Sequence, residues 1–435
     1  MIGIRREDKN DWERRTPLTP RHAATLLAER GVGTVVQPSP LRAFPDGDYT
    51  AVGARVDESL DACNTILGIK EVPVDALIAG KAYVFFSHTT KGQAHNMPLL
   101  RAILDRRITL LDYERIVDPS GRRLVFFGRH AGSAGMIDSL WALGRRLERR
   151  GRPNPFAAIE PAHRYDSLAA AEAEIARVGE EIGRTGVPAG LHPLVFGFTG
   201  TGNVSRGAQE VFDELPVCSV APEELSGLTE ASDRHVVYKT VFDLADRFVH
   251  KSGGAVTIDA LSREPEQFDN GMLRYLRHLT VLVNGMFWVP ALPRLLGLDD
   301  LRQGWGSGEL AGLELIADIS CDVGGAIEAN VRATAPDAPV YVYDLTHERA
   351  IDGVEGNGPV ILAVDILPAE LPRESSEAFG DSLLAFVEPL ARCDWNRPLE
   401  QLALPAELGP AVIAHRGRLA PAFDYLERHL SESGA

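Results

Sequence analysis

The sequence has only four cysteines among its 435 residues, and none of them lies in a paired pattern. Cys63, Cys218, Cys321 and Cys393 are far apart and form no CxxC motif. This spacing indicates neither a disulfide framework nor a metal site. It predicts reduced and mostly buried thiols, as in a cytoplasmic protein.

Long hydrophobic runs and an excess of positive charge are also lacking. No stretch reaches the roughly 18 apolar residues that a membrane span requires, and the N-terminal MIGIRREDKNDWERR has no apolar leader segment. The formal net charge of -16 argues against nucleic acid or an anionic membrane as a partner. We therefore expect a soluble, cytoplasmic protein.

The composition that remains is that of a globular chain, with 45% apolar and 24% charged residues. A chain of 435 residues is too long for one ordinary core, so two domains are expected. Up to residue 127, β-like runs alternate with helical runs such as PRHAATLLAERG. This alternation predicts an α/β fold with a parallel sheet and crossover helices. The strand candidates are GIRRE, GTVVQPS, NTILGIKE, YVFFSH, ITLLDYE and RLVFFG.

A long helical pattern over residues 131–151 divides the chain. It has small residues at its start, arginines near its end and Gly151 as a stop signal. We interpret this helix as a link between two domains, and the segment ATAPDAPV as the return linker. The prediction is a discontinuous substrate-binding and catalytic domain over residues 1–128 and 335–435, and a dinucleotide-binding Rossmann domain over residues 129–334.

The second domain contains LVFGFTGTGNVSRGAQEVF, an apolar strand followed by a glycine turn and a helix. Gly200 and Gly202 form a G-x-G, and Ser205 stands where the third glycine of G-x-G-x-x-G would fall. The first glycine allows a tight turn, the second lets a pyrophosphate approach the backbone, and the helix N-terminus holds the anion. This order of elements favours dinucleotide binding over a purely structural turn.

The type of dinucleotide is indicated by the segment about 20 residues after the first glycine, where NAD-binding proteins carry an acidic group for the ribose. This segment reads CSVAPEEL, in which Ser219 to Pro222 are not acidic and Glu223 follows late. A missing carboxylate removes the usual obstacle to a 2′-phosphate. We therefore favour NADP(H), with NAD(H) as the alternative.

Two predicted strands of the first domain end on titratable side chains. ILGIKEVP ends on Lys70 and Glu71, and VFFSHTTKGQ breaks at His88, which is followed by Lys91 and Gln93. Ligands of doubly wound sheets bind outside the carboxyl ends of the strands. A lone lysine or histidine is more often a solvated loop residue. The convergence of several such residues nevertheless favours a polar site.

Several motifs occur in the same order as in a known family. They are ERRTPLTP, ILGIKEVP, VFFSHTTKGQ, LLDYERIVD, GNVSRGAQEVF, VNGMFWVPALPRLL and DILPAELPRESSEAFGD. With these motifs, nearly the whole chain resembles the lysine–ketoglutarate reductases. These are the lysine-forming saccharopine dehydrogenases, including the N-terminal half of the bifunctional aminoadipic semialdehyde synthases. The family is related to alanine dehydrogenase and transhydrogenase, which implies two Rossmann-like domains with parallel sheets and a catalytic cleft between them.

The resemblance implies a reaction and a set of site residues. L-Lysine and 2-oxoglutarate would condense, and NAD(P)H would reduce the imine to saccharopine, with the reverse oxidation also catalysed. Lys70 and His88 match the family's acid–base pair, and Arg15 matches its carboxylate binder, with Arg14 as the alternative. The other implied substrate-binding residues are Glu71, Lys91, Gln93, Glu114 and Asp322. The predicted cofactor-binding residues are Gly200, Gly202, Asn203, Val204, Ser205, Asn284 and Ile319.

The chemistry of imine formation suits these residue types. It requires a neutral amine, a proton for the departing hydroxyl and a base that takes one back. A histidine such as His88 exchanges protons near neutral pH. Lys70 needs a lowered pKa, which burial or the nearby Lys91 would supply and Glu71 would oppose.

Two departures from the family leave the exact substrate and cofactor open. Human-type reductases carry a basic residue where Glu71 stands, whereas fungal saccharopine dehydrogenases carry an acid, and the chain is expected to lack a fused second dehydrogenase. One alternative is an alanine-dehydrogenase-like or opine-forming enzyme that uses another amine and oxo acid. The other is a catalytically silent, dinucleotide-binding metabolite sensor. Small molecules are the expected partners, and the sequence leaves a homo-oligomer open.

Overall fold

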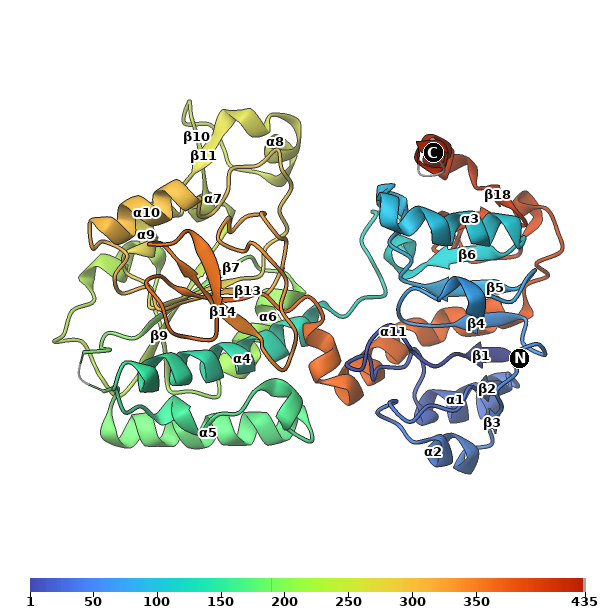
Figure 1. Ribbon diagram of the computed structural model, residues 1–435, viewed down its shortest axis with the longest axis horizontal. Coiled ribbons are helices and arrows are strands. Elements are labelled where there is room, and N and C mark those ends of the chain that lie inside the picture. The colour runs from blue at the N-terminus through green and yellow to red at the C-terminus, as the bar shows by residue number, and fades with distance from the viewer. Residues whose placement is uncertain (189, 433–435) are drawn as a thin grey trace. The chain divides into compact units, whose positions relative to one another are not determined.

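The computed structural model describes residues 1–188 and 190–432 and divides the chain into two compact units (Figure 1). Unit 1 comprises Met1–Phe127 and Pro372–Ala435, and unit 2 comprises Gly128–Leu371. Each unit is built around one large sheet that is mostly parallel. The predicted α/β fold class is confirmed.

The sheet of unit 1 has eight strands in the order β18-β17-β6-β5-β4-β1-β2-β3. The six strands from β6 to β3 in this order are parallel, whereas β17 and β18 are antiparallel additions at one edge. The strands are β1 (Ile2–Ile4), β2 (Thr34–Val36), β3 (Arg55–Val56), β4 (Thr65–Leu67), β5 (Ala82–Phe85), β6 (Thr109–Asp112), β17 (Val412–His415) and β18 (Arg418–Leu419).

Helices cover both faces of this sheet. Leu26 of α1 and Leu383 of α11 pack with Leu67 on one face, whereas Leu100 of α3 and Leu426 of α12 pack with neighbouring strand residues on the other. Burial on both faces is typical of parallel strands linked by crossover helices. The helices are α1 (Pro20–Arg30), α2 (Asp46–Ala51), α3 (Met97–Asp105), α11 (Pro372–Arg392) and α12 (Leu426–Glu432).

The sheet of unit 2 also has eight strands, in the order β15-β14-β16-β13-β12-β7-β9-β8. The strands from β16 to β8 are parallel, and β14 and β15 are antiparallel. They are β7 (Val195–Thr199), β8 (Val217–Ser219), β9 (Val237–Phe242), β12 (Val281–Asn284), β13 (Leu315–Asp318), β14 (Val340–Asp344), β15 (Arg349–Asp352) and β16 (Val360–Leu362). A separate antiparallel ribbon joins β10 (Phe248–His250) to β11 (Phe268–Asn270).

The long helix predicted over residues 131–151 is α4 (Gly128–Arg149), and Gly151 follows it with a φ of 68°. It packs closely on α6 (Asn203–Phe212) through glycines on both helices. A Cβ on Gly132 would lie 1.9 Å from the carbonyl oxygen of Val204, so the two backbones are in contact there. The other helices of unit 2 are α5 (Leu168–Thr185), α7 (Leu244–Arg247), α8 (Ile258–Arg263), α9 (Leu273–Leu276) and α10 (Leu298–Gly306).

Two details of the fold differ from the sequence-based expectation. The chain returns to unit 1 at Pro372, later than the predicted residue 335, because β16 pairs with β13 and β14 pairs with β16. The segment over residues 335–371 therefore completes the sheet of unit 2. The strand predicted at RLVFFG is reduced to a single bridge between Val117 and Arg123. The chain there instead leads directly into α4.

Candidate active site

Lys70 and His88 follow neighbouring strands at the same edge of the sheet in unit 1. Lys70 comes three residues after β4 and His88 three residues after β5, and Leu67 of β4 pairs with Val84 of β5. The pairing continues beyond the strands, because the Phe86 N–H donates to the Ile69 carbonyl at 3.0 Å. Both predicted acid–base residues therefore lie at the carboxyl edge, where such sheets bind ligands.

A chain of polar contacts joins Glu71 to this edge. Nδ1 of His88 lies 2.7 Å from Oε1 of Glu71, and Nζ of Lys9 donates to Oε2 of Glu71 at 2.6 Å. Burial would raise the pKa of Glu71, but the hydrogen bonds from His88 and Lys9 outweigh it and hold the pKa at about 2. Glu71 is thus a carboxylate at neutral pH, held between a lysine and an imidazole.

Lys70 lies in an environment that disfavours its charge. Burial lowers its pKa first, and the positive charges of Arg15 and Lys9 lower it further, against the opposing effect of Glu13 and Glu71. The lowered pKa agrees with the chemical requirement inferred from the sequence. The cations responsible are Arg15 and Lys9, whereas the sequence suggested Lys91.

Glu7 holds the backbone that carries Lys70. Its carboxylate accepts from the N–H groups of Ile69 at 2.7 Å and Lys70 at 3.0 Å, and its side chain is only 3% exposed. Burial raises its pKa to about 7, although the nearby Arg5 and the two N–H groups act in the opposite direction. Glu7 therefore fixes the position at which the Lys70 side chain leaves the sheet.

Arg15 is already paired within its own loop. Its Nε and Nη2 donate to Glu13 at 2.8 and 2.6 Å, and both side chains are at most 3% exposed. The guanidinium also lies over the Phe127 ring, 4.2 Å from its centroid. Arg14, the alternative carboxylate binder, is exposed and donates to the Leu41 carbonyl at 3.4 Å.

The remaining predicted substrate residues of unit 1 are more peripheral. Glu114 follows β6 and accepts from Nη2 of Arg123 at 3.0 Å. Lys91 and Gln93 are exposed in the short helical turns after His88. The structure thus places Lys70, Glu71 and His88 at one edge of the sheet and joins Glu71 directly to His88.

Sequence reasoning missed Lys9, Glu7 and Glu13 as parts of this arrangement. All three belong to the segment REDKNDWE, which follows β1. Since β1 pairs in parallel with β4, its end lies at the same edge as Lys70. The rule that identified Lys70 and His88 from strand ends would have found them if it had been applied to the first strand.

The glycine turn of unit 2 has the form that the sequence predicts. It joins β7 to α6, Gly200 has a φ of 83°, and Gly202 is the N-cap of the helix. Thr201, Gly202 and Asn203 are exposed at the helix N-terminus, whereas Ser205 is buried and accepts from Gln209 at 3.1 Å. A strand, a glycine turn and an open helix N-terminus together form an arrangement suited to a pyrophosphate.

Asn284 and Ile319 are placed behind this turn. The Asn284 side chain is fully buried, and it accepts from Thr199 at 2.7 Å and donates to Asp318 at 2.8 Å. These bonds connect the ends of β7, β12 and β13, so Asn284 positions the edge of the sheet from within. Ile319 is also buried and packs beside Gly135 of α4. Asp322 is exposed in the loop after β13.

The segment used to infer the cofactor type lies on an outer strand. Ser219 ends β8, which pairs with β9 and not with β7. The strand that pairs with β7 on this side is β9, and Asp243 follows it directly. Ser219 to Pro222 therefore do not lie beside the glycine turn, and the lack of an acid among them does not indicate the cofactor type.

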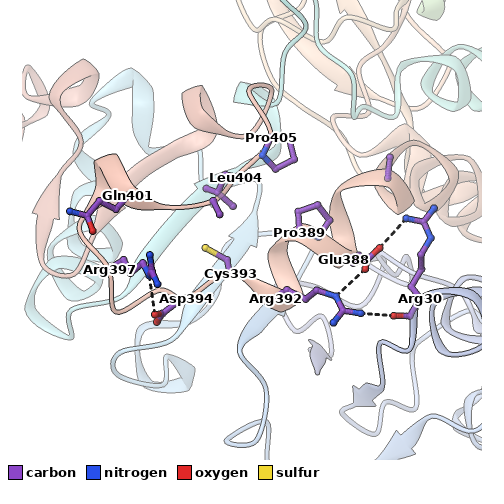
Figure 2. Close-up of a pocket in the computed structure, with 12 residues that line it drawn as sticks. Arg30, Glu388, Pro389, Arg392, Cys393, Asp394, Arg397, Gln401, Leu404 and Pro405 are labelled. Atoms are coloured by element: carbon purple, nitrogen blue, oxygen red, sulfur yellow. Dashed lines mark hydrogen bonds and ion pairs between the residues drawn. The ribbon is translucent and has the colours of Figure 1, made fainter.

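A pocket of about 860 Å³ lies at the other edge of the sheet in unit 1, near the C-terminal ends of α1 and α11 (Figure 2). This edge is the one at which the parallel strands begin, because Thr65, the first residue of β4, donates to the carbonyl of Leu390 in α11 at 2.7 Å. Glu388 lies between Arg30 and Arg392, which it pairs with at 3.2 and 2.9 Å. The pocket is therefore separate from the group formed by Lys70 and His88.

None of the helices within residues 1–188 and 190–432 is long and apolar enough to cross a membrane. Within the same ranges, no group of three or more His, Cys, Asp or Glu side chains could hold a metal ion.

Comparison with known proteins gives matches over the whole chain. Residues 3–134 match the family described as alanine dehydrogenase/PNT, N-terminal domain. An alpha-aminoadipic semialdehyde synthase from Arabidopsis thaliana is 41% identical over 447 residues, which cover 98% of this chain and 41% of that protein. The chain is similar to the alpha-aminoadipic semialdehyde synthases over 98% of its own length. The resemblance inferred from the motifs is thereby confirmed.

The chain spans less than half the length of that relative, 41%. A saccharopine dehydrogenase (NAD(+), L-lysine-forming) from Neurospora crassa is 27% identical over 417 residues, covering 92% of this chain and 93% of that protein. Among solved structures, an L-alanine dehydrogenase matches with a TM-score of 0.64 at 19% identity, covering 99% of each chain. This structural likeness supports the fold of two Rossmann-like units.

Proposed function

We propose that the protein catalyses the pyridine-nucleotide-dependent condensation of L-lysine with 2-oxoglutarate to saccharopine, together with the reverse oxidation. The names of the relatives support this reaction, since one is a saccharopine dehydrogenase of the L-lysine-forming type. The observation that carries the proposal is the group of proton-handling side chains at the ends of β4 and β5. Lys70, Glu71 and His88 are the residue types that imine formation requires.

His88 is the proposed proton donor and acceptor for the substrate. In the neutral ring the Nδ1–H donates to Glu71, which leaves the proton-accepting lone pair on Nε2. The side chain is 33% exposed, so a bound molecule can reach the ring. Glu71 thus orients the ring and stabilises the imidazolium that forms when His88 takes a proton.

Lys70 is the proposed second group of the acid–base pair. Its lowered pKa increases the neutral fraction of its amine near neutral pH. A neutral amine can take the proton that the lysine substrate must lose before it attacks the oxo group. Glu7 holds the Lys70 backbone in place during these transfers.

The substrate carboxylates require a cationic partner. Arg15 uses Nε and Nη2 for Glu13, so it would reach a carboxylate through Nη1. Arg14 offers an exposed guanidinium instead. Both remain candidates, because a guanidinium binds carboxylates while staying charged at all relevant pH values.

The residues of the glycine turn fit a dinucleotide. Gly200 and Gly202 have no side chain, and the N-terminus of α6 is exposed beside them. A reduced pyridine nucleotide, when bound, supplies the hydride that reduces the imine. The preference for NADP(H) rested on the lack of an acid at Ser219 to Pro222. Because this segment follows β8, which pairs with β9, it no longer supports that preference.

The test is the oxidation of NADH and of NADPH by purified protein with 2-oxoglutarate, with and without L-lysine. Oxidation that depends on both substrates and yields saccharopine is expected. Oxidation with other amines or oxo acids but not with this pair would indicate an alanine-dehydrogenase-like or opine-forming enzyme. Nucleotide binding with no turnover of any pair would indicate the metabolite sensor.

A further inference from the structure

Asp243 stands beside the glycine turn, on the strand that neighbours β7. Parallel pairing aligns Phe198 with Val241 and Thr199 with Phe242. Extending this register by one residue places Asp243 alongside Gly200, the first glycine of the turn. Figure 1 shows β7 and β9 in the same sheet of unit 2.

The strand order identifies which neighbour of β7 matters for the adenosine ribose. In dinucleotide-binding sheets of order 3-2-1-4-5, the glycine turn follows strand 1, and the acidic residue for the ribose hydroxyls follows the adjacent strand 2. Here β7 occupies the position of strand 1, β12 and β13 lie on one side, and β9 and β8 lie on the other. By position in the sheet, β9 therefore corresponds to strand 2.

The carboxylate of Asp243 is exposed and held in a fixed orientation. It is the N-cap of α7, and its Oδ1 accepts from the N–H groups of Ala245 at 2.7 Å and Asp246 at 3.2 Å. The Asp243 N–H in turn donates to the Asp246 carboxylate at 2.9 Å. Two carboxylates therefore lie within one turn of the chain at this edge.

Arg247, the cation in this turn, does not neutralise the two carboxylates at the surface. Arg247 is only 7% exposed, and its Nε donates to the Asp243 carbonyl at 2.8 Å while Nη1 points to the Met286 sulfur at 3.3 Å. A buried guanidinium committed to these atoms cannot fork around a phosphate group. The carboxylates of Asp243 and Asp246 beside the glycine turn therefore suit a ribose diol and repel a 2′-phosphate.

We propose that Asp243 binds the adenosine ribose hydroxyls of NAD(H) and selects against the 2′-phosphate of NADP(H). The inference rests on the dinucleotide binding proposed for the glycine turn, and it reverses the preference drawn from the sequence. The usual spacing of about 20 residues from the first glycine leads to the end of β8, the first strand after the turn helix. The insertion of β9 between β7 and β8 moves the relevant acid from the segment near residue 219 to residue 243.

The proposal is tested by titrating the intact protein with NADH and NADPH and following the quenching of tryptophan fluorescence. Wild-type protein is expected to bind NADH more tightly, because a hydrogen bond to a charged group corresponds to roughly 10- to 100-fold in affinity. The variant Asp243→Ser removes the charge but keeps a residue type that caps helices well. Its preference for NADH should shrink by the same factor, because NADH loses this hydrogen bond and NADPH no longer meets a carboxylate.

Asp259→Asn is the matched control, since it removes an exposed carboxylate of unit 2 that pairs with Arg263 in its own helix. It should leave both affinities unchanged, and circular dichroism should show both variants folded. Equal or tighter NADPH binding by the wild type, or an unchanged ratio in Asp243→Ser, would overturn the proposal while leaving the proposed reaction intact. Failure to bind either nucleotide would overturn the assignment of the glycine turn as well.

Discussion

Nδ1 of His88 lies 2.7 Å from Oε1 of Glu71, so the imidazole is held by a carboxylate that Lys9 also contacts. His88 has a φ of 51°, a left-handed conformation that few residues other than glycine adopt. The unusual backbone conformation sets where the side chain leaves the chain, and the carboxylate orients the ring, as expected for a group that donates and accepts protons at a fixed position.

Replacing Glu71 with Gln tests the importance of this contact. The amide cannot stabilise an imidazolium as a carboxylate does, and a hydrogen bond to a charged group corresponds to roughly 10- to 100-fold in rate. We expect kcat for saccharopine formation to fall by this factor with little change in nucleotide affinity. Asp75→Asn, which neutralises an exposed carboxylate of the same unit, should leave kcat unchanged. A Glu71→Gln enzyme with normal kcat would exclude this role.

Arg15→Ala is expected to destabilise unit 1. The substitution leaves the Glu13 carboxylate, whose side chain is 1% exposed, without its bidentate partner. Removing one member of a buried ion pair costs about 3–5 kcal/mol. Urea unfolding should show this loss, whereas Arg14→Ala should change the free energy of unfolding by less than about 0.5 kcal/mol. Similar stabilities for the two variants would show that the Arg15–Glu13 pair is not formed.

The stability of unit 2 is expected to fall as the pH rises from about 5 to about 8. Glu370 and Asp138 are both buried, and burial raises the pKa of Asp138 and raises that of Glu370 to about 8. Because the folded state keeps a proton that the unfolded chain releases near its ordinary pKa, the stabilising contribution is complete at low pH. It is lost as the pH rises through the pKa of the folded state, by up to about 1.4 kcal/mol per pH unit.

Glu370→Gln should make this pH dependence shallower, because the amide carries no proton to release. Urea unfolding at several pH values measures the slope directly. Glu180→Gln, on the exposed face of α5, serves as a control that should retain the wild-type slope. A wild-type slope in Glu370→Gln would show that another group is responsible.

Gly207→Ala is expected to disrupt the contact between α4 and α6. The added Cβ would lie 1.9 Å from the carbonyl oxygen of Arg129, which is backbone and cannot rotate away. Overpacking of this kind costs about 1–3 kcal/mol or more, and it would shift α6 and the glycine turn before it. Gly183→Ala in α5 is the control, because its Cβ would meet open space and should stabilise the helix by about 1 kcal/mol. Thermal unfolding of the two variants should therefore move in opposite directions.

The sequence predicts the parts of this fold in which local pattern and tertiary structure agree. The long helix from Gly128, the turn at Gly200 and the strand ends at Lys70 and His88 all have signals within a short window. The return of the chain at Pro372 has no such signal, because it depends on β16 pairing with a strand more than 40 residues earlier.

The same limit applies to the site residues. Asn284 was predicted to bind the cofactor, yet its side chain is buried and bonded to residues of two neighbouring strands, β7 and β13. Asp243 was not identified because the order of β8 and β9 in the sheet differs from their order along the chain. The burial of Asn284 and the position of Asp243 both depend on pairing between distant strands. Composition or periodicity within a short window contains no information about that pairing.

The most direct test of the central claim is the rate of NAD(P)H oxidation with L-lysine and 2-oxoglutarate in wild type, Lys70→Met and His88→Gln. We predict that each variant lowers turnover by roughly 10²- to 10⁴-fold while nucleotide affinity stays near that of the wild type. Turnover of the double variant at the wild-type rate would contradict the account.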